Sequence, residues 1–277
     1  MSTARLTREV ARLRARAFAR NARARMPADR VEFVRHVGEK LHRRTIDPDP
    51  WQERILRSDA RQKIVTASRQ VGKSTVVAGL TLHKAMFTPE SLSLIFAPTE
   101  RQAKEAFAKV SRFYLAAGGT IATTSVRKMG LSLENGSRIE AMPATENTIR
   151  GFTADLVVID EAAYARDAFY DSVLPSLAVS DGDLILASTP CGKRGFFYEE
   201  WASGEGWERH EVPATECERI SPAFLERERR RRGERYYRQE YNCEFVGTGD
   251  RVFSEEVIAL AFSTDVEPLF EQGELEE

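Results

Sequence analysis

Cysteine is scarce in this 277-residue sequence, and long apolar stretches are missing from it. The three cysteines, Cys191, Cys217 and Cys243, form no Cys-x-x-Cys pair. An odd number of widely spaced cysteines argues against a disulfide framework and a structural zinc site, and it fits a reducing compartment. The four histidines show no metal-ligand spacing. No apolar stretch approaches the ~18–20 residues that a membrane span requires, so no membrane partner is expected.

Neither sign of charge dominates the chain, but the charges are unevenly distributed. The net charge is −1, so the chain as a whole is not a general polyanion binder. Residues 1–44 contain twelve arginines and one lysine against four acids, a net charge of +9, whereas residues 252–277 contain eight acids and no lysine or arginine. This asymmetry suggests an interaction arm at the start of the chain. A solvated amphipathic helix is an equally good interpretation.

A phosphate-binding loop is indicated by residues 67–75, Ala-Ser-Arg-Gln-Val-Gly-Lys-Ser-Thr, which continue the apolar run 64–67. The backbone N–H groups of such a loop, and the positive end of the helix that follows it, can hold phosphate oxygens. Lys73 can reach the β- and γ-phosphates of a nucleotide, and Ser74 can place its hydroxyl on Mg²⁺. Ala67 replaces the first glycine of the general motif, so the loop alone also fits an ordinary strand–turn–helix.

A pair of acids follows the apolar residues 156–159, which are typical of a buried strand in a parallel sheet. Asp160 can hold Mg²⁺ through water, and Glu161 can orient and deprotonate an attacking water. Phosphoryl transfer needs this division between a group for the metal and a group for the nucleophile. An acidic helix cap is the alternative interpretation, but the loop and the acidic pair in this order favour nucleotide hydrolysis.

A third apolar run, residues 184–187, ends in two hydroxyl side chains and a proline. Side chains at the carboxyl end of such a strand face the nucleotide crevice of an α/β sheet. Ser188 and Thr189 could therefore sense the γ-phosphate and transmit its loss. A simple end of the strand at Pro190 is the alternative.

Together these residues resemble the ATPase domain of a large terminase subunit, the motor that packs DNA into tailed-phage and herpesvirus capsids. The resemblance spans roughly residues 50–245 and includes an arginine in the phosphate loop and the missing first glycine. The matching segments are Trp51-Gln52, Ser68-Arg69-Gln70-Val71-Gly72-Lys73-Ser74, Phe96-Ala97-Pro98-Thr99, Arg150-Gly151, Val158-Ile159-Asp160-Glu161-Ala162-Ala163 and Ser188-Thr189-Pro190.

The resemblance implies the cofactors ATP and Mg²⁺ and a set of nucleotide-binding residues. These are Trp51, Gln52, Ser68, Arg69, Gln70, Val71, Gly72, Lys73, Ser74 and Thr75, with Ser74 and Asp160 at the metal. Trp51 and Gln52 resemble the adenine-side contact, although plain packing is an alternative for Trp51.

Catalytic roles are implied for Glu161, for Arg69 and for Arg150. The Arg69 guanidinium could form charge-assisted bonds to phosphate oxygens. Arg150 is similar to an arginine finger that reaches into the next subunit of a ring, with a loop salt bridge as the alternative. In related translocases the segment after Thr99 faces nucleic acid, so Arg101 and Lys104 are candidate contacts to DNA phosphates.

The alternation of apolar runs and helical segments predicts an α/β fold with a mostly parallel sheet covered by helices on both faces. An extra strand resembles the additional-strand class of P-loop NTPases. We expect helices at 73–87 and 100–117, a hairpin turn at 133–138, and strands near 62–67, 92–97, 121–126, 137–142, 155–160 and 183–188.

Four regions are expected along the chain. They are a basic helical arm (1–46), a P-loop ATPase core (47–212), a small helical lid subdomain (213–250) and an acidic tail (251–277). The lid contains a cluster of arginines between Arg227 and Arg238, which could contact DNA, a neighbouring subunit or only water. A nuclease domain would start in the tail, but the acids there, including Asp265 and Glu267, lie in no strand-like frame, so no nuclease activity is expected.

The predicted function is an ATP-driven motor that moves double-stranded DNA into a procapsid without regard to sequence. The implied partners are the portal protein, the small terminase subunit and further copies in a ring, with a monomer possible in isolation. The expected location is the host cytoplasm, transiently at the portal. A helicase-like translocase and a non-catalytic nucleotide-gated assembly module remain alternatives; Glu161 argues against the second, because a pure binding switch does not need it.

Overall fold

The computed structural model describes residues 26–43, 47–146, 148–149 and 151–247, which contain an eight-stranded sheet in the order β3-β4-β5-β2-β6-β7-β1-β8. In this spatial order, the six strands β5, β2, β6, β7, β1 and β8 pair in parallel with their neighbours. The pairings of β3 with β4 and of β4 with β5, at one edge of the sheet, are antiparallel. The strands are β1 (Gln62–Ala67), β2 (Leu92–Ala97), β3 (Thr123–Arg127), β4 (Gly130–Leu133), β5 (Arg138–Pro143), β6 (Leu156–Asp160), β7 (Asp183–Ser188) and β8 (Glu208–Val212).

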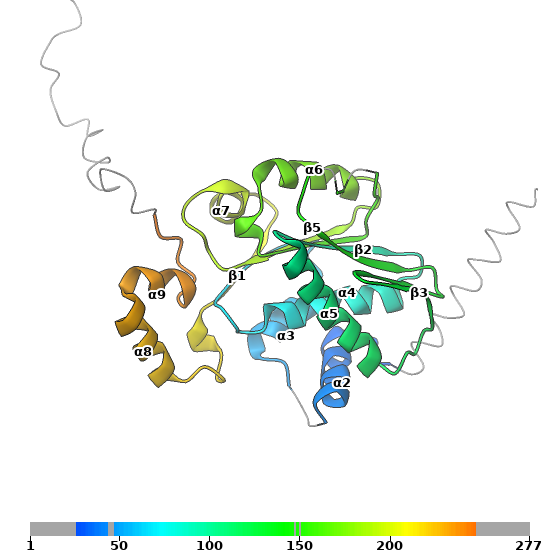
Figure 1. Ribbon diagram of the computed structural model, residues 1–277, viewed down its shortest axis with the longest axis horizontal. Helices are drawn as coiled ribbons and strands as arrows, with labels where there is room; N and C mark the ends of the chain where they lie inside the picture. Colours follow the sequence, from blue (N-terminus) through cyan, green and yellow to red (C-terminus); the bar gives the residue numbers. More distant parts are fainter. Residues whose placement is uncertain (1–25, 44–46, 147, 150, 248–277) are drawn as a thin grey trace, which may run out of the picture.

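Helices cover both faces of the sheet, as the sequence predicted (Figure 1). One face carries α2 (Arg30–His42), α3 (Pro50–Arg57), α4 (Lys73–Phe87) and α5 (Glu100–Ala116), and the other carries α6 (Asp167–Leu177) and α7 (Gly195–Ala202). A separate apolar cluster lies under each set. The mixed α/β class and the mostly parallel sheet are therefore confirmed.

A small helical subdomain follows β8, in the region where the sequence predicts a lid, and it is called the lid below. It contains the short 3₁₀ helix η2 (Ala214–Glu216), then α8 (Pro222–Arg232) and α9 (Glu234–Glu240). Gly233, with φ of 84°, separates the two helices as expected. Its own apolar cluster joins Ala214, Leu225 and Tyr241, with Phe224, Tyr236 and Tyr237 packed against it.

The order of the central strands places the three predicted site segments side by side. β7 lies between β1 and β6 and pairs with both in parallel, so it is the additional strand of the sheet. Because parallel strands end at the same edge, the loop after β1, the acids after β6 and the hydroxyls after β7 converge there. Helix α4 begins at Lys73 and β6 ends at Asp160, within a residue of the predicted boundaries.

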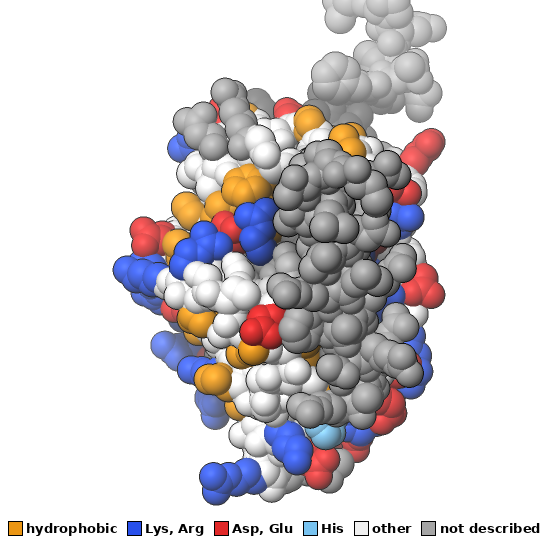
Figure 2. Space-filling model, turned by 90° about the vertical axis from the view of Figure 1, so that its right-hand side faces the viewer, with side chains coloured by type: hydrophobic (Ala, Val, Ile, Leu, Met, Phe, Trp, Pro, Cys, Tyr) orange, Lys and Arg blue, Asp and Glu red, His pale blue; other side chains and the backbone are white. Residues whose placement is uncertain are grey.

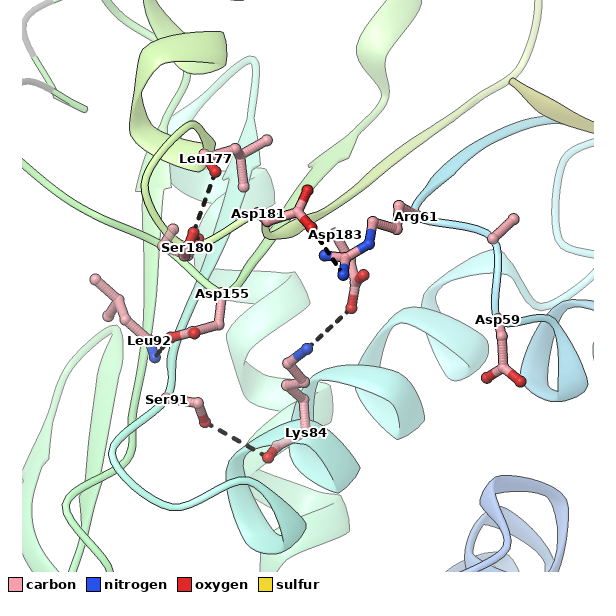
Figure 3. Close-up of polar contacts among 12 residues, drawn as sticks. Asp59, Arg61, Lys84, Ser91, Leu92, Asp155, Leu177, Ser180, Asp181 and Asp183 are labelled. Atoms are coloured by element: carbon pink, nitrogen blue, oxygen red, sulfur yellow. Dashed lines mark hydrogen bonds and ion pairs between the residues drawn. The ribbon is translucent and has the colours of Figure 1, made fainter. Parts of the chain in front are cut away.

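Polar contacts tie the opposite, amino-terminal edge of the sheet (Figure 3). Lys84 of α4 lies 3.0 Å from Asp183 at the start of β7, and Arg61 lies 2.9 Å from Asp181. The backbone N–H of Leu92, the first residue of β2, donates to the Asp155 carboxylate at 2.8 Å. These contacts join the starts of β2 and β7 to the segments that precede β6 and to helix α4.

Helix α2 belongs to the packed core, although the sequence analysis placed it in a separate arm. Val31, Phe33, Val34 and Val37 are buried in the same cluster as the helices α4 and α5. Asp29 caps the helix by accepting hydrogen bonds from two backbone N–H groups. The arginine content of the segment masked this apolar spacing. The rest of the predicted arm, residues 1–25 and 44–46, lies outside the described residues.

Two short strands and two helices escaped the sequence analysis. Strand β8 reads Glu-Arg-His-Glu-Val and pairs with β1 at the edge of the sheet. Its charged residues do not have the apolar pattern of the central strands, so the sequence did not indicate it. Strand β4 has four residues and forms the first arm of the predicted hairpin with β5. Helices α6 and α7 were not assigned, although helices were expected on both faces.

The described surface has scattered apolar side chains. Leu115 of α5 and Val126 of the edge strand β3 are 73% and 69% exposed. Figure 2 shows the side that carries this edge, where basic, acidic and hydrophobic side chains are interspersed over the described part. Among the described helices, none combines the length and the apolar character needed to cross a bilayer.

Phe33→Ala should lower the free energy of unfolding by about 3–5 kcal/mol, because the ring is fully buried in α2 and meets Phe87 and His83 edge-on or nearly so. Leu115→Ala is the matched control, since this exposed side chain should change stability by no more than about 0.5 kcal/mol. Urea denaturation followed by circular dichroism measures both. Equal small effects would show that α2 is not part of the cooperative core.

Candidate nucleotide site

The phosphate loop is held in a defined conformation by its neighbours. Gln70 and Gly72 have positive φ values of 61° and 111°, which turn the chain from β1 into α4. The backbone N–H of Ser68 donates to Val212 O at 3.0 Å, and that of Arg69 donates to Glu240 O at 3.3 Å. The loop is therefore bonded on one side to the end of β8 and on the other to the end of α9.

Lys73 connects the loop to the acidic pair. Its side chain is buried and its Nζ donates to Ala67 O at 3.1 Å. The same Nζ lies 3.7 Å from Oε1 of Glu161. Two segments that are far apart in the sequence thus meet at one ammonium group.

Glu161 is held at the end of β6 in a left-handed conformation, with φ of 55°. Its Oε2 accepts a hydrogen bond from the Ser188 hydroxyl at 3.3 Å, and its backbone N–H donates to Asp160 Oδ1 at 3.2 Å. Burial, and then the neighbouring Glu161 charge, raise the pKa of Asp160 to about 6. The site thus concentrates negative charge beside Lys73.

Lys73 and Glu161 border one cavity of about 570 Å³ at the carboxyl edge of the sheet. Its lining unites residues of all three predicted segments, namely Arg69, Gln70, Gly72, Lys73, Ser74, Glu161 and Thr189. Three further lining residues, Gln102, Lys109 and Tyr164, were missed by sequence reasoning. Gln102 and Lys109 are seven residues apart on α5, so helical spacing from Thr99 could have indicated their shared face.

The donors at the cavity fit Mg²⁺, which prefers oxygen ligands and often relies on one or two protein groups plus substrate phosphates. Ser74 lines the cavity and supplies a hydroxyl. Asp160 does not line it, but it lies beside the lining residue Glu161 and supplies a carboxylate whose charged form is disfavoured by burial. A bound cation would relieve that penalty. Among the described residues, no three or more His, Cys, Asp or Glu side chains form a metal cluster, so phosphate and water would complete the coordination.

Trp51 and Gln52 occupy different surroundings. Trp51 is 1% exposed and packs in the core beneath α3, which supports the packing alternative for it. Gln52 is part of a capping box with Asp49, and its Nε2 donates to Gly72 O at 3.4 Å. The Gln52 side chain thus contacts a backbone carbonyl of the phosphate loop.

Arg69 points from the loop to the lid. Its Nε forms a salt bridge with Glu240, a side chain that is only 4% exposed. This hydrogen bond raises the pKa of the Arg69 guanidinium, so the group stays charged. Arg69 also lines the cavity, so it stands between the phosphate site and α9.

Arg219 is a second link between the lid and the loop, and no motif in the sequence indicated it. Its guanidinium donates to both Asp49 oxygens at 2.8 Å and to Val71 O at 2.9 Å. It therefore ties the lid to the start of α3 and to the phosphate loop at once. A bidentate arginine–carboxylate pair of this kind fixes orientation as well as distance.

The remaining predicted residues lie away from the cavity or outside the described residues. Arg101 and Lys104 lie on α5, where they pair with Glu105 and Glu100 one turn away. Arg101 is 87% exposed, and neither residue lines the cavity. Arg150 is not among the described residues, so its predicted role as a finger remains a prediction.

Comparison with known proteins gives one consistent result. The family model for the N-terminal part of the terminase large subunit, T4-like-virus type, matches residues 64–260. The terminase large subunits of Thermus phage G20c and Escherichia phage T5 are each 28% identical to this chain, over 245 and 243 residues. These matches cover 75% and 81% of this chain but 50% and 54% of the two relatives, so the chain spans about half the length of the curated relatives it matches.

Solved structures show the same fold. The large terminase ATPase domain of Thermus phage P74-26 superposes with a TM-score of 0.65 and 24% identity, covering 75% of this chain and 97% of that domain. The large terminase of another thermophilic bacteriophage, solved in complex with ADP, gives a TM-score of 0.62 and 14% identity. That match covers 72% of this chain and 54% of the other protein.

Gly72→Ala should destabilise the chain, because its backbone φ of +111° is one that L side chains rarely adopt, and Gln52 Nε2, 2.7 Å from the new Cβ, would have to shift. Gly118→Ala is the matched control, since it also has a positive φ, of +70°, but no atom within 4 Å of the new Cβ. The Gly72 variant should lose at least about 1 kcal/mol more than the Gly118 variant in chemical denaturation. Equal losses would mean that neither the backbone conformation of Gly72 nor its contact with Gln52 constrains the loop.

Proposed function

The chain belongs to the family of T4-like-virus-type terminase large subunits, and we propose that it is their ATP-hydrolysing motor domain, which drives double-stranded DNA into a procapsid. The observation that carries this proposal is the 3.7 Å approach of Lys73 Nζ to Glu161 at one cavity. A phosphate-binding lysine and a water-activating carboxylate are the two groups that nucleotide hydrolysis must bring together.

ATP is the proposed nucleotide. The large terminase of the thermophilic bacteriophage compared above, whose fold this chain shares, has been solved with ADP and with ATP-γ-S. In this chain, the loop Ser68–Thr75 offers backbone N–H groups at the start of α4, and Lys73 offers a positive charge for the β- and γ-phosphates. The cavity beside the loop provides the space for the phosphates.

Each side chain then has a separate role in hydrolysis. Glu161 is the base that orients and deprotonates the attacking water, and Ser188 positions its carboxylate. Ser74 and Asp160 would hold Mg²⁺, which supplies charge stabilisation at the phosphates. Lys73 forms an ion pair with Glu161, and a bound phosphate would be a second anionic partner for the lysine. Ser188 and Thr189 couple the γ-phosphate to β7.

The partners are proposed from family membership and from charge. Duplex DNA would be bound through its phosphates, with Arg101 and Lys104 as candidate contacts. The portal protein, the small terminase subunit and other copies in a ring complete the machine, with Arg150 acting as a finger in trans and the host cytoplasm as the location. The expected absence of nuclease activity concerns residues after 250, outside those described, and stays a prediction.

Glu161→Gln should retain ATP binding within about threefold and reduce turnover by a factor of at least about 10², because the amide cannot take a proton from water. Lys73→Ala should weaken binding as well, since a phosphate contact is lost. Calorimetry and a phosphate-release assay separate the two effects. Glu105→Gln, an exposed change on α5, is the control and should behave as the wild type. Wild-type turnover in Glu161→Gln would refute the assigned base.

Duplex DNA together with portal should accelerate ATP turnover by this chain, because a packaging motor couples the two. The same assay separates the alternatives. A helicase-like translocase would respond to single-stranded DNA without portal, and a nucleotide-gated assembly module would bind ATP without turnover. Raising the salt concentration should weaken DNA binding steeply and equally for unrelated sequences, since phosphates are the predicted contacts.

A further inference from the structure

A small polar cavity lies at the amino-terminal edge of the sheet, opposite the edge that carries the phosphate loop. Its volume is about 160 Å³, and it shares no lining residue with the phosphate cavity. Its walls come from the start of α2, the segment between α3 and β1, the second half of α4 and the first residues of β1, β6 and β7. Figure 3 shows part of this edge, where Lys84 reaches Asp183.

Lys63 is a buried cation in the wall of this cavity. It is the second residue of β1 and is only 5% exposed. Its Nζ donates to the backbone carbonyl of Ala60, and among the described residues it forms no ion pair with a carboxylate. Burying an ammonium group without a counter-ion is unfavourable, and burial accordingly lowers the pKa of Lys63. The cavity beside it offers space for a counter-ion from solution.

The other charged side chains in the wall are already paired with one another. Arg30 of α2 lies 2.9 Å from Asp59, and Lys84 of α4 lies 3.0 Å from Asp183. All four line the cavity together with Lys63, so the described wall contains three cationic side chains against two carboxylates. Lys63 is the cation that these two pairs leave without a partner of opposite charge.

Two further groups near Lys63 do not supply the missing counter-ion. The charge of Glu208 acts on Lys63 from β8, but its carboxylate accepts a hydrogen bond from the Ser58 hydroxyl at 2.9 Å and contacts the ring of His210. His83 lines the cavity, and its Nε2 lies 2.8 Å from a backbone oxygen. Burial lowers the pKa of His83, so its ring is mostly neutral near pH 7.

The size and the polarity of the cavity suit a small oxyanion such as phosphate or sulfate. Its volume is many times the ~10–15 Å³ that one water needs, but less than a third of that of the phosphate cavity. Lysine has three N–H groups to donate, and the bond to Ala60 uses one of those of Lys63. Helix α4 ends beside the cavity, and Lys84 in its last turn offsets the negative end of the helix dipole.

We infer that this cavity is a binding site for a free oxyanion of the size of phosphate, with Lys63 and Arg30 as its principal ligands. The anion is the counter-ion that Lys63 lacks. The inference is independent of the proposed hydrolysis, because no residue of the site belongs to the phosphate loop or to the acidic pair. It concerns the same scaffold, however, since β1 and α4 line this cavity and carry the phosphate loop between them.

The test is a calorimetric titration of the full chain with inorganic phosphate. All variants carry Lys73→Ala, which removes a phosphate contact of the loop. Lys63→Met should weaken phosphate binding at least about tenfold, because the buried ammonium is lost. Arg30→Gln should weaken it at least about threefold, and it leaves only Asp59, which is 89% exposed, without its partner. Arg61→Gln is the matched control, since this exposed arginine lies at the same edge but does not line the cavity, and it should change nothing.

Stability measurements show whether the variants are folded. Without phosphate, Lys63→Met should be at least as stable as its parent, because an uncompensated buried charge is removed. If Lys63→Met does not fold, Arg30→Gln decides alone. Absence of phosphate binding in the parent, or unchanged affinity in Arg30→Gln or in a folded Lys63→Met, would overturn the site. Tighter binding of glycerol 3-phosphate than of phosphate would contradict a site for the free ion.

Crystals grown with selenate give an independent readout that needs no substitution. Anomalous density between Lys63 and Arg30 supports the site, and density at the phosphate loop alone contradicts it. A chain that binds phosphate through Lys63 but does not hydrolyse ATP would refute the proposed motor function and leave the oxyanion site standing.

Discussion

The parallel pairing of β1, β7 and β6 is the constraint on which the site depends. None of the three segments that follow these strands has a chemical function alone. Their shared edge brings the ammonium of Lys73 within 3.7 Å of Glu161 and the hydroxyl of Ser188 within 3.3 Å of the same carboxylate. The buried apolar runs before each segment supply the free energy that holds this edge together. The charged groups themselves contribute chemistry more than stability.

Much of the fold and of the phosphate cavity could be predicted from the sequence, because apolar runs and glycine have strong local signatures. Residues of the phosphate loop, Glu161 of the acidic pair and Thr189 meet at one cavity. Gln102, Lys109 and Tyr164 could not be found in this way, since their place depends on how α5 and η1 (Ala162–Tyr164) lie over the loop. Charged residues also obscured two elements in the sequence. Helix α2 packs in the core and β8 joins the sheet, although both contain many charged residues.

The lid links distant parts of the chain more tightly than its exposed, arginine-rich sequence suggests. Several arginines of α8 and α9 pair with acids of the lid itself, among them Arg229 with Glu234 and Arg230 with Glu226. Exposed pairs of this kind contribute little stability. The contacts that matter are those made by Arg69 and Arg219, because each joins the lid to the phosphate loop. A change at the phosphates therefore has a direct mechanical route to the lid.

The backbone bonds of the phosphate loop have a thermodynamic consequence. Ser68 and Arg69 each donate a backbone N–H to a neighbouring element, and Thr75 N donates to Gly72 O at 2.9 Å. The partners in these bonds are protein atoms, so the loop does not need a ligand to complete them. Nucleotide binding then incurs only a small part of the ordering entropy that a flexible glycine-rich loop would require. Affinity at this site is governed by the charges and by the cavity walls, and release of the product need not wait for the loop to unfold.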